Sequence, residues 1–263
     1  MKPQATIEEI EFAPDRTLSL ETGRIAKQAD GSVVVRLGDT MVLSTATISD
    51  SVRNSNFFPL TVDYREKFAA GGKVPGGFIK REGRPTDKET LTARLIDRAV
   101  RPLFPDGFYH DVHVVNFVIS AGRDYDADVI AGVGSSAALM LSGAPFGGPI
   151  AEVRVGRVDG EYIVNPTMEQ TAQSDMDLIV AGKEDALVMV EGEAHEISEE
   201  DMIDALDEAH SAIRRLCRGQ HQLVQEFGEP EPFEWEADVV PGALVDKMKQ
   251  QYGQKVADAI RGE

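Results

Sequence analysis

One basic segment of the sequence combines residue types that bind anions. The stretch GGKVPGGFIKREGRP, residues 71–85, places Lys80, Arg81 and Arg84 directly after the pair Phe78-Ile79. Guanidinium and ammonium groups bind phosphate through charge-assisted hydrogen bonds, and an aromatic ring can stack on a nucleobase. The segment is therefore predicted to contact an anion, either a nucleic acid or a small phosphate ester.

Three arginines follow the basic segment at helical spacing. Arg94, Arg98 and Arg101 are separated by four and three residues, so a helix would place them on one face. Such a stripe suits successive phosphates, because each guanidinium offers a planar fork of donors. The alternative is that these arginines pair with Asp97, Glu89 or acidic groups elsewhere, and the sequence leaves both interpretations open.

The chain is acidic overall, but its positive charge is concentrated. Its 263 residues include 27 Lys/Arg and 45 Asp/Glu, a net charge of −18. Between Asp63 and Arg101 there are ten basic and six acidic residues, a net of +4, which leaves 17 basic against 39 acidic residues elsewhere. Because salt screens charges beyond about 10 Å, the local cluster decides what this segment binds.

A second candidate for phosphate binding is the stretch AGVGSSAALM, Ala131–Met140. Glycines and serines that open a helix can cradle phosphate with backbone N–H groups, as in the small-molecule kinases of the galactokinase/homoserine kinase family. Asp128 stands where that family has a proline, and a carboxylate there would repel phosphate. The competing interpretation is that the small residues allow close packing of a helix on a sheet.

No other residues form a catalytic or metal-binding set. His110 and His113 in HDVH lack a further Cys/His cluster, and Cys217 lies on the apolar face of a predicted helix. We therefore predict no catalytic residue and no metal ligand in this chain.

Composition favours a cytoplasmic protein without a membrane segment. Hydrophobic residues make up 42% of the chain, which suffices for a core, and no apolar run is long enough to span a bilayer. A single cysteine excludes internal disulfides and fits a reducing cytoplasm.

The elements that must position these residues form an α+β pattern. Alternating apolar residues predict strands, while caps and helical spacing predict helices. The predicted strands lie in 31–48 (a hairpin turning at Leu37-Gly38-Asp39), 57–65, 111–120, 150–158, 177–180 and 187–190. The predicted helices follow a capping box at Thr86–Glu89, span 128–142, follow a cap at Ser198, and span 243–260.

A proline-rich, acidic stretch near the C-terminus predicts a domain boundary. GEPEPFEWEADVVPG follows Phe227 and reads as a linker to one more helix. Residues 1–228 are thus predicted to form one domain. Residues 229–263 are predicted to be a linker and the start of an all-helical domain that continues beyond Glu263.

Long stretches of the chain closely resemble the bacterial polynucleotide phosphorylase family. They are Phe57–Phe108, Gly132–Ile150 and Ser174–Gly182, and the resemblance continues in order up to the linker. It implies an RNase PH-like (ribosomal protein S5 domain 2-like) fold, with mixed sheets packed with helices, as the first of two such domains. The second domain and RNA-binding KH and S1 modules would lie beyond Glu263.

The resemblance also implies an activity and an RNA-binding site. The family degrades RNA from the 3′ end with inorganic phosphate, releases nucleoside diphosphates, and forms a homotrimeric ring around a channel that single-stranded RNA enters. A Phe-Phe-Arg-Arg loop grips RNA there, and this chain departs from it at Ile79 and Lys80. The expected RNA contacts are Phe78, Ile79, Lys80, Arg81, Arg84, Arg94, Arg98 and Arg101. An RNA-degradation complex is a possible partner.

The family's catalytic groups are largely missing here. Its active half holds Mg²⁺ with Asp-x5-Asp-x-Lys, and the corresponding positions are Thr171, Asp177 and Ile179. The family's phosphate-binding serines align with Asp126-Ala127-Asp128, whose two carboxylates would repel phosphate. We therefore expect this half to be non-catalytic, with the Mg²⁺ site outside this chain. Two alternative functions remain open. One is a small-molecule kinase, and the other is a pure assembly module whose basic helix docks an acidic partner.

Overall fold

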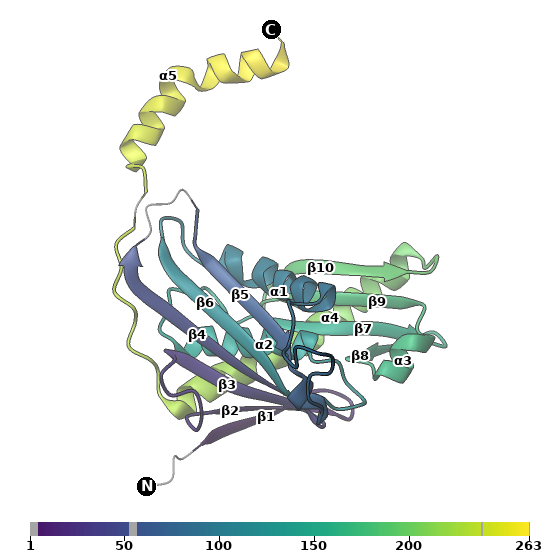
Figure 1. Ribbon diagram of the computed structural model, residues 1–263. Coiled ribbons are helices and arrows are strands. Elements are labelled where there is room, and N and C mark those ends of the chain that lie inside the picture. The colour runs from purple at the N-terminus through teal and green to yellow at the C-terminus, as the bar shows by residue number, and fades with distance from the viewer. Residues whose placement is uncertain (1–4, 53–56, 238, 263) are drawn as a thin grey trace.

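The computed structural model describes residues 5–52, 57–237 and 239–262. Figure 1 shows two sheets side by side with helices packed on them. The first sheet has six strands in the order β1-β2-β3-β4-β6-β5, and only the β5–β6 pairing is parallel. Its strands are β1 Thr6–Ala13, β2 Arg16–Thr22, β3 Gly31–Leu37, β4 Thr40–Val52, β5 Leu60–Glu66 and β6 His110–Ser120.

The second sheet is smaller and fully antiparallel. Its order is β10-β9-β7-β8, with β7 Ala151–Val158, β8 Glu161–Val164, β9 Met176–Gly182 and β10 Leu187–Ala194. The α-helices are α1 Asp87–Val100, α2 Asp128–Leu141, α3 Met168–Gln173, α4 Glu199–Phe227 and α5 Gly242–Arg261. The predicted α+β class is confirmed.

Most of the predicted elements are present, and the differences are instructive. The hairpin around Gly38 forms β3 and β4, while the strand predicted from Phe57 begins at Leu60. β1, β2, β8 and α3 were not predicted. β1 and β2 carry many polar residues because each leaves alternate side chains exposed or half-buried, so their apolar signal is weak.

The capping box at the start of α1 is confirmed, and it also attaches the helix to the sheet. The Thr86 hydroxyl accepts a hydrogen bond from the Glu89 N–H, and the Glu89 carboxylate accepts one from the Thr86 N–H at 2.7 Å. The other Glu89 oxygen accepts from the N–H of Glu66, at the end of β5, at 2.8 Å. Glu89 is buried, and its carboxylate satisfies two backbone donors at once in partly buried hydrogen bonds.

Replacing Glu89 with alanine is therefore expected to destabilise the chain by about 2 kcal/mol, because it removes two hydrogen bonds to a charged acceptor and half of the capping box. Urea denaturation followed by circular dichroism measures this change. Asp87→Ala, on the exposed side of the same helix end, serves as the control. Equal stability of the two variants would show that the Glu89 bonds contribute nothing.

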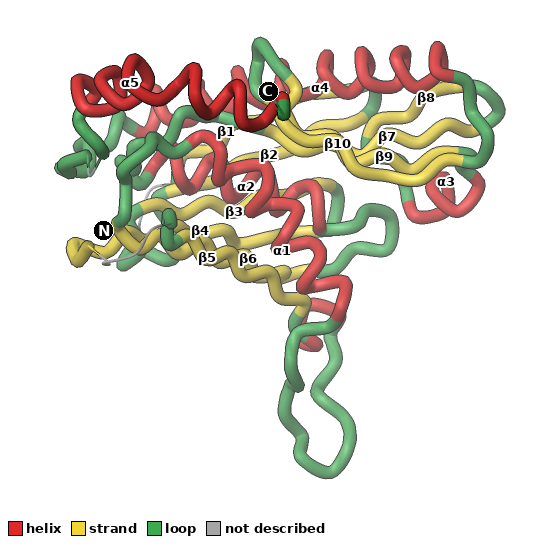
Figure 2. Tube along the Cα trace, turned by 90° about the horizontal axis from the view of Figure 1, so that it is seen from above, coloured by secondary structure: helices red, strands yellow, loops and turns green. Residues whose placement is uncertain are grey.

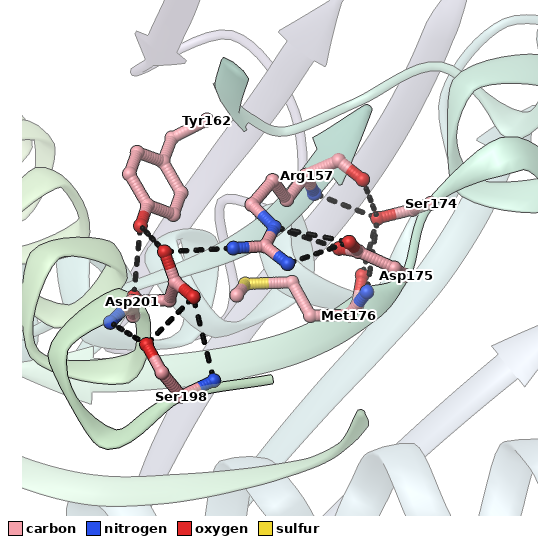
Figure 3. A network of polar contacts seen from close by, with 7 residues as sticks. All are labelled: Arg157, Tyr162, Ser174, Asp175, Met176, Ser198 and Asp201. Carbon is pink, nitrogen blue, oxygen red and sulfur yellow. Dashed lines mark hydrogen bonds and ion pairs between the residues drawn. The ribbon is translucent and has the colours of Figure 1, made fainter. Parts of the chain in front are cut away.

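A polar network attaches the N-terminal end of α4 to the second sheet (Figure 3). The Arg157 guanidinium on β7 pairs with Asp175 at 2.7 Å and with Asp201, in the first turn of α4, at 2.8 Å. Ser198 and Asp201 form the predicted N-terminal cap, here as a capping box. Hydrogen bonds from Ser198, and then Arg157, lower the pKa of Asp201 to about 2. The network therefore stabilises the fold at neutral pH and weakens as the pH falls toward that value.

The predicted linker is partly anchored to the body. The Phe233 N–H donates to the Gly143 carbonyl at 2.8 Å, and the rings of Phe233 and Trp235 meet Phe108 edge-on. Beyond this segment α5 projects away from the sheets (Figure 1), and none of its described residues is buried. The segment is anchored because Phe233 and Trp235 pack against the aromatic cluster around Phe108.

Candidate functional site

The basic loop between β5 and α1 extends away from both sheets (Figure 2). Phe78 is fully exposed and Ile79 is 77% exposed, so the loop presents two apolar side chains to solvent. Gly77 and Lys80 both have positive φ, 75° and 50°, which builds a tight turn around the pair. A non-glycine residue in this region costs free energy, and such strain recurs at binding sites.

The cations that follow the exposed pair have no ion-pair partner in the described part of the chain. Lys80, Arg81 and Arg84 are exposed and form no ion pair with the described residues. The base of the loop is fixed instead by Glu82, which pairs with Lys67 at 2.7 Å and accepts from the Phe68 N–H at 3.0 Å. The loop thus has a fixed base and a tip whose charges face solvent.

The three helix arginines have different environments. Arg94 is exposed and has no ion-pair partner among the described residues, and Arg98 pairs with Glu191 on β10. Arg101 pairs with Asp97 and donates to the carbonyls of Phe58 and Leu60 at 2.8 and 3.1 Å. The alternative of internal pairing therefore describes Arg98 and Arg101, and only Arg94 of the three has no ion-pair partner among the described residues.

A cavity of about 350 Å³ brings together residues that are distant in sequence. Asp126 and Asp128 reach it from the start of α2, Thr171 from α3 and Asp177 from β9. These are the positions that the family resemblance assigned to the phosphate and metal sites of the active half. Three of these four residues are carboxylates, and apolar side chains, among them Leu37, Val129 and Met168, line much of the rest of the cavity. Ile179 lies in a neighbouring groove beside α1.

Arg154 on β7 is the residue of this cavity that the sequence did not single out. Its guanidinium donates to the Asp128 carboxylate at 2.5 Å and to both oxygens of Asp177. Its pKa is raised, since the charges of the two aspartates outweigh the opposing effect of burial. The sequence feature that could have identified Arg154 is the strand AEVRVGRV. In it Glu152 and Arg154 occupy alternate, inward positions among apolar residues.

Glu152, also on β7, is a further carboxylate in the interior. It is 1% exposed, and its Oε1 atom has no hydrogen-bond partner among the described residues. Burial first, and the charge of Asp128 second, raise its pKa to about 8. Glu152 is therefore mostly protonated at neutral pH.

The small residues of α2 serve close packing. A Cβ atom at Gly132 would lie 2.1 Å from a Glu152 oxygen, and one at Gly134 would lie 2.3 Å from the Ser44 hydroxyl. Ser135 donates to Asn116, and Ser136 accepts from the Ile150 N–H. The helix begins at Asp128, so the stretch lies inside it and is buried, which confirms the packing interpretation and removes the motif on which the kinase alternative rested.

The remaining candidates are structural. The His110 ring lies 2.9 Å from the Ser49 carbonyl, His113 pairs with Asp63, and Cys217 is buried. Within the described residues no three His, Cys, Asp or Glu side chains are grouped to hold a metal ion. No helix in the described part of the chain is long and apolar enough to cross a membrane.

Two domain models match this chain. The model described as 3′ exoribonuclease family, domain 1 covers residues 15–145, and the one described as 3′ exoribonuclease family, domain 2 covers residues 148–212. The first model spans β2 to β6 of the larger sheet together with α1 and α2, and the second spans all four strands of the smaller sheet. The rice protein Rrp46 has a similar structure, with a TM-score of 0.62 and 16% identity over 85% of this chain and 96% of that one, which shows the fold alone.

Bacterial relatives are much more similar. Polyribonucleotide nucleotidyltransferase of Salinibacter ruber is 83% identical over 262 residues, covering 100% of this chain and 37% of the relative. The Chlorobaculum parvum enzyme of the same name is 51% identical over 90% of this chain and 32% of its own length. The chain thus spans about a third of these relatives. It belongs to the 3′ exoribonuclease family, with the predicted RNase PH-like fold and similarity to bacterial polyribonucleotide nucleotidyltransferases.

Proposed function

We propose that this chain is the RNA-binding, ring-forming and non-catalytic half of a phosphorolytic 3′-to-5′ exoribonuclease that degrades mRNA. The observation that carries the proposal is the loop tip, where exposed Phe78 and Ile79 are followed by cations without ion-pair partners among the described residues. Proteins that bind single-stranded RNA combine stacking side chains with a cationic groove along the backbone. Because the rest of the chain is acidic, we expect the RNA strand to contact the chain at this loop tip.

The chemistry belongs to another part of the protein. Inorganic phosphate is the co-substrate and nucleoside diphosphates are the products, and Mg²⁺ is held at a site outside this chain. The whole protein forms a homotrimer in the cytoplasm, and the three loops surround its channel. A larger RNA-degradation complex is a further partner. The similarity to nucleotidyltransferases supports this assignment, as do the carboxylates found where phosphate would bind.

Lys80 and Arg81 are the loop cations that we expect to contact RNA phosphates. Replacing both with alanine is expected to reduce the slope of log binding constant against log salt concentration by about 0.7 for each phosphate that the variant no longer neutralises. Fluorescence anisotropy with a labelled single-stranded RNA at several salt concentrations measures the slope. Arg94→Ala tests in the same way whether the RNA-binding surface continues along α1.

The control replaces two lysines that lie far from the loop. Lys247 and Lys249 are exposed on α5, so their double alanine variant removes the same charge from the chain. A slope that falls only for the loop variant supports the proposal. An unchanged slope for the loop variant would contradict it and favour an assembly module in which the basic residues dock an acidic protein.

A further inference from the structure

The carboxylates of the inner cavity already have a cationic partner. Every oxygen of Asp128 and Asp177 accepts a hydrogen bond within the chain. Both Asp177 oxygens and one Asp128 oxygen accept from Arg154, and the other Asp128 oxygen accepts from the Val129 N–H at 2.7 Å. The side chains of Arg154 and Asp128 are only 16% and 7% exposed, so water competes weakly for these bonds.

These residues do not fit a divalent metal ion. Mg²⁺ requires oxygen ligands at near-octahedral geometry and usually keeps several waters. The Thr171 hydroxyl donates to the Thr167 carbonyl, Ile179 offers no oxygen, and a guanidinium lies between the two aspartates. A metal ion there would have to displace Arg154 and bury its charge without a partner, which is costly.

We infer that Arg154 is the resident cation of this cavity and that it takes the place of a divalent metal ion. One guanidinium neutralises two carboxylates that would otherwise repel each other across the space between α2 and β9. The other charged groups nearby are balanced or neutral, since Asp126 pairs with Lys88 at 2.9 Å and Glu152 is mostly protonated. The inference rests on the proposed function and deepens it, because it names the residue that keeps metal out of this half.

The test removes the guanidinium and asks whether metal enters. Arg154→Met keeps an unbranched side chain without charge, so it frees both carboxylates in an open cavity. Titration with Mn²⁺, followed by electron paramagnetic resonance of the free ion, is expected to show at least about tenfold tighter binding to this variant than to the natural chain, a difference of about 1.4 kcal/mol. The added site should disappear in Arg154→Met/Asp177→Asn.

Arg154→Lys is the matched control, since it keeps the positive charge and is expected to leave Mn²⁺ binding as weak as in the natural chain. A second measurement applies if Arg154→Met folds poorly. Mn²⁺ should then raise its melting temperature, because a ligand that binds only the folded state stabilises it, and should leave the natural chain unchanged.

Two results would overturn the inference. One is tight Mn²⁺ binding by the natural chain that Asp177→Asn abolishes. The other is an Arg154→Met variant that Mn²⁺ neither binds nor stabilises. The RNA-binding loop lies outside this cavity, so RNA affinity is measured on the same samples. If the loop variant bound RNA as tightly as the natural chain, that result would contradict the proposed function. It would not change the conclusion drawn from Mn²⁺ binding.

Discussion

The Glu152→Gln variant is expected to gain about 3 kcal/mol of stability relative to the natural chain between pH 4.5 and pH 7, because it removes the cost of keeping a buried carboxyl group protonated. Burial, with the charge of Asp128, raises the pKa of Glu152 from 4.5 to about 8. The folded chain therefore binds one more proton than the unfolded chain between these values. Stability falls as the pH rises through that window, and glutamine, which has nearly the same shape, cannot titrate.

Urea denaturation at a series of pH values measures the effect. The difference in unfolding free energy between variant and natural chain should grow from pH 4.5 to pH 8 and then stay constant. Glu193→Gln, an exposed position on β10 at the edge of the second sheet, is the control and should show no such growth. A Glu152→Gln variant with the same pH dependence as the natural chain would show that Glu152 is ionised in the fold.

Replacing Phe78 with alanine is expected to weaken RNA binding by roughly 5- to 150-fold, since one stacked base contributes about 1–3 kcal/mol. The ring is fully exposed, so the change should leave the unfolding free energy within about 0.5 kcal/mol of the natural value. Ile79→Phe is expected to act in the opposite direction, because it adds a second ring beside the first. Anisotropy titration with a single-stranded RNA measures both variants.

Phe227 provides the matched control for the ring. It is 47% exposed at the end of α4, on a different part of the surface, and Phe227→Ala should bind RNA like the natural chain. Equal affinities of Phe78→Ala and the natural chain would contradict a stacking role for the loop. A parallel loss of stability in Phe78→Ala would instead indicate that the ring packs within the protein.

The features that the sequence predicted well are those that depend on neighbours in the chain. The capping box of α1 needs two side chains three residues apart and formed as expected, and the predicted cap at Ser198 of α4 formed as well, as a capping box with Asp201. The hairpin between β3 and β4 depends on its turn, where Gly38 adopts a positive φ of 59° that glycine tolerates well. The internal pairing of Arg101, the residue after α1, with Asp97 four residues earlier is another local feature that the sequence already allowed.

The features that the sequence missed depend on distant partners. Arg154 meets Asp128 and Asp177, which are 26 and 23 residues away, only because α2 lies over β7 and β9 pairs with it in one register. The family resemblance aligned Asp128 and Asp177 with the phosphate and metal positions of the active half, but the sequence indicated no cation to join them. The burial of Glu152 also depends on the glycine in α2 that makes room for its carboxylate.

The most direct test of the proposed function measures RNA binding and chemistry in one sample. The purified chain is mixed with 5′-labelled single-stranded RNA, Mg²⁺ and inorganic phosphate, and both bound RNA and released nucleoside diphosphates are followed. We predict that RNA is bound, that it keeps its length, and that no nucleoside diphosphate forms. Shortening of the RNA from its 3′ end with release of nucleoside diphosphates would contradict a non-catalytic, RNA-binding half.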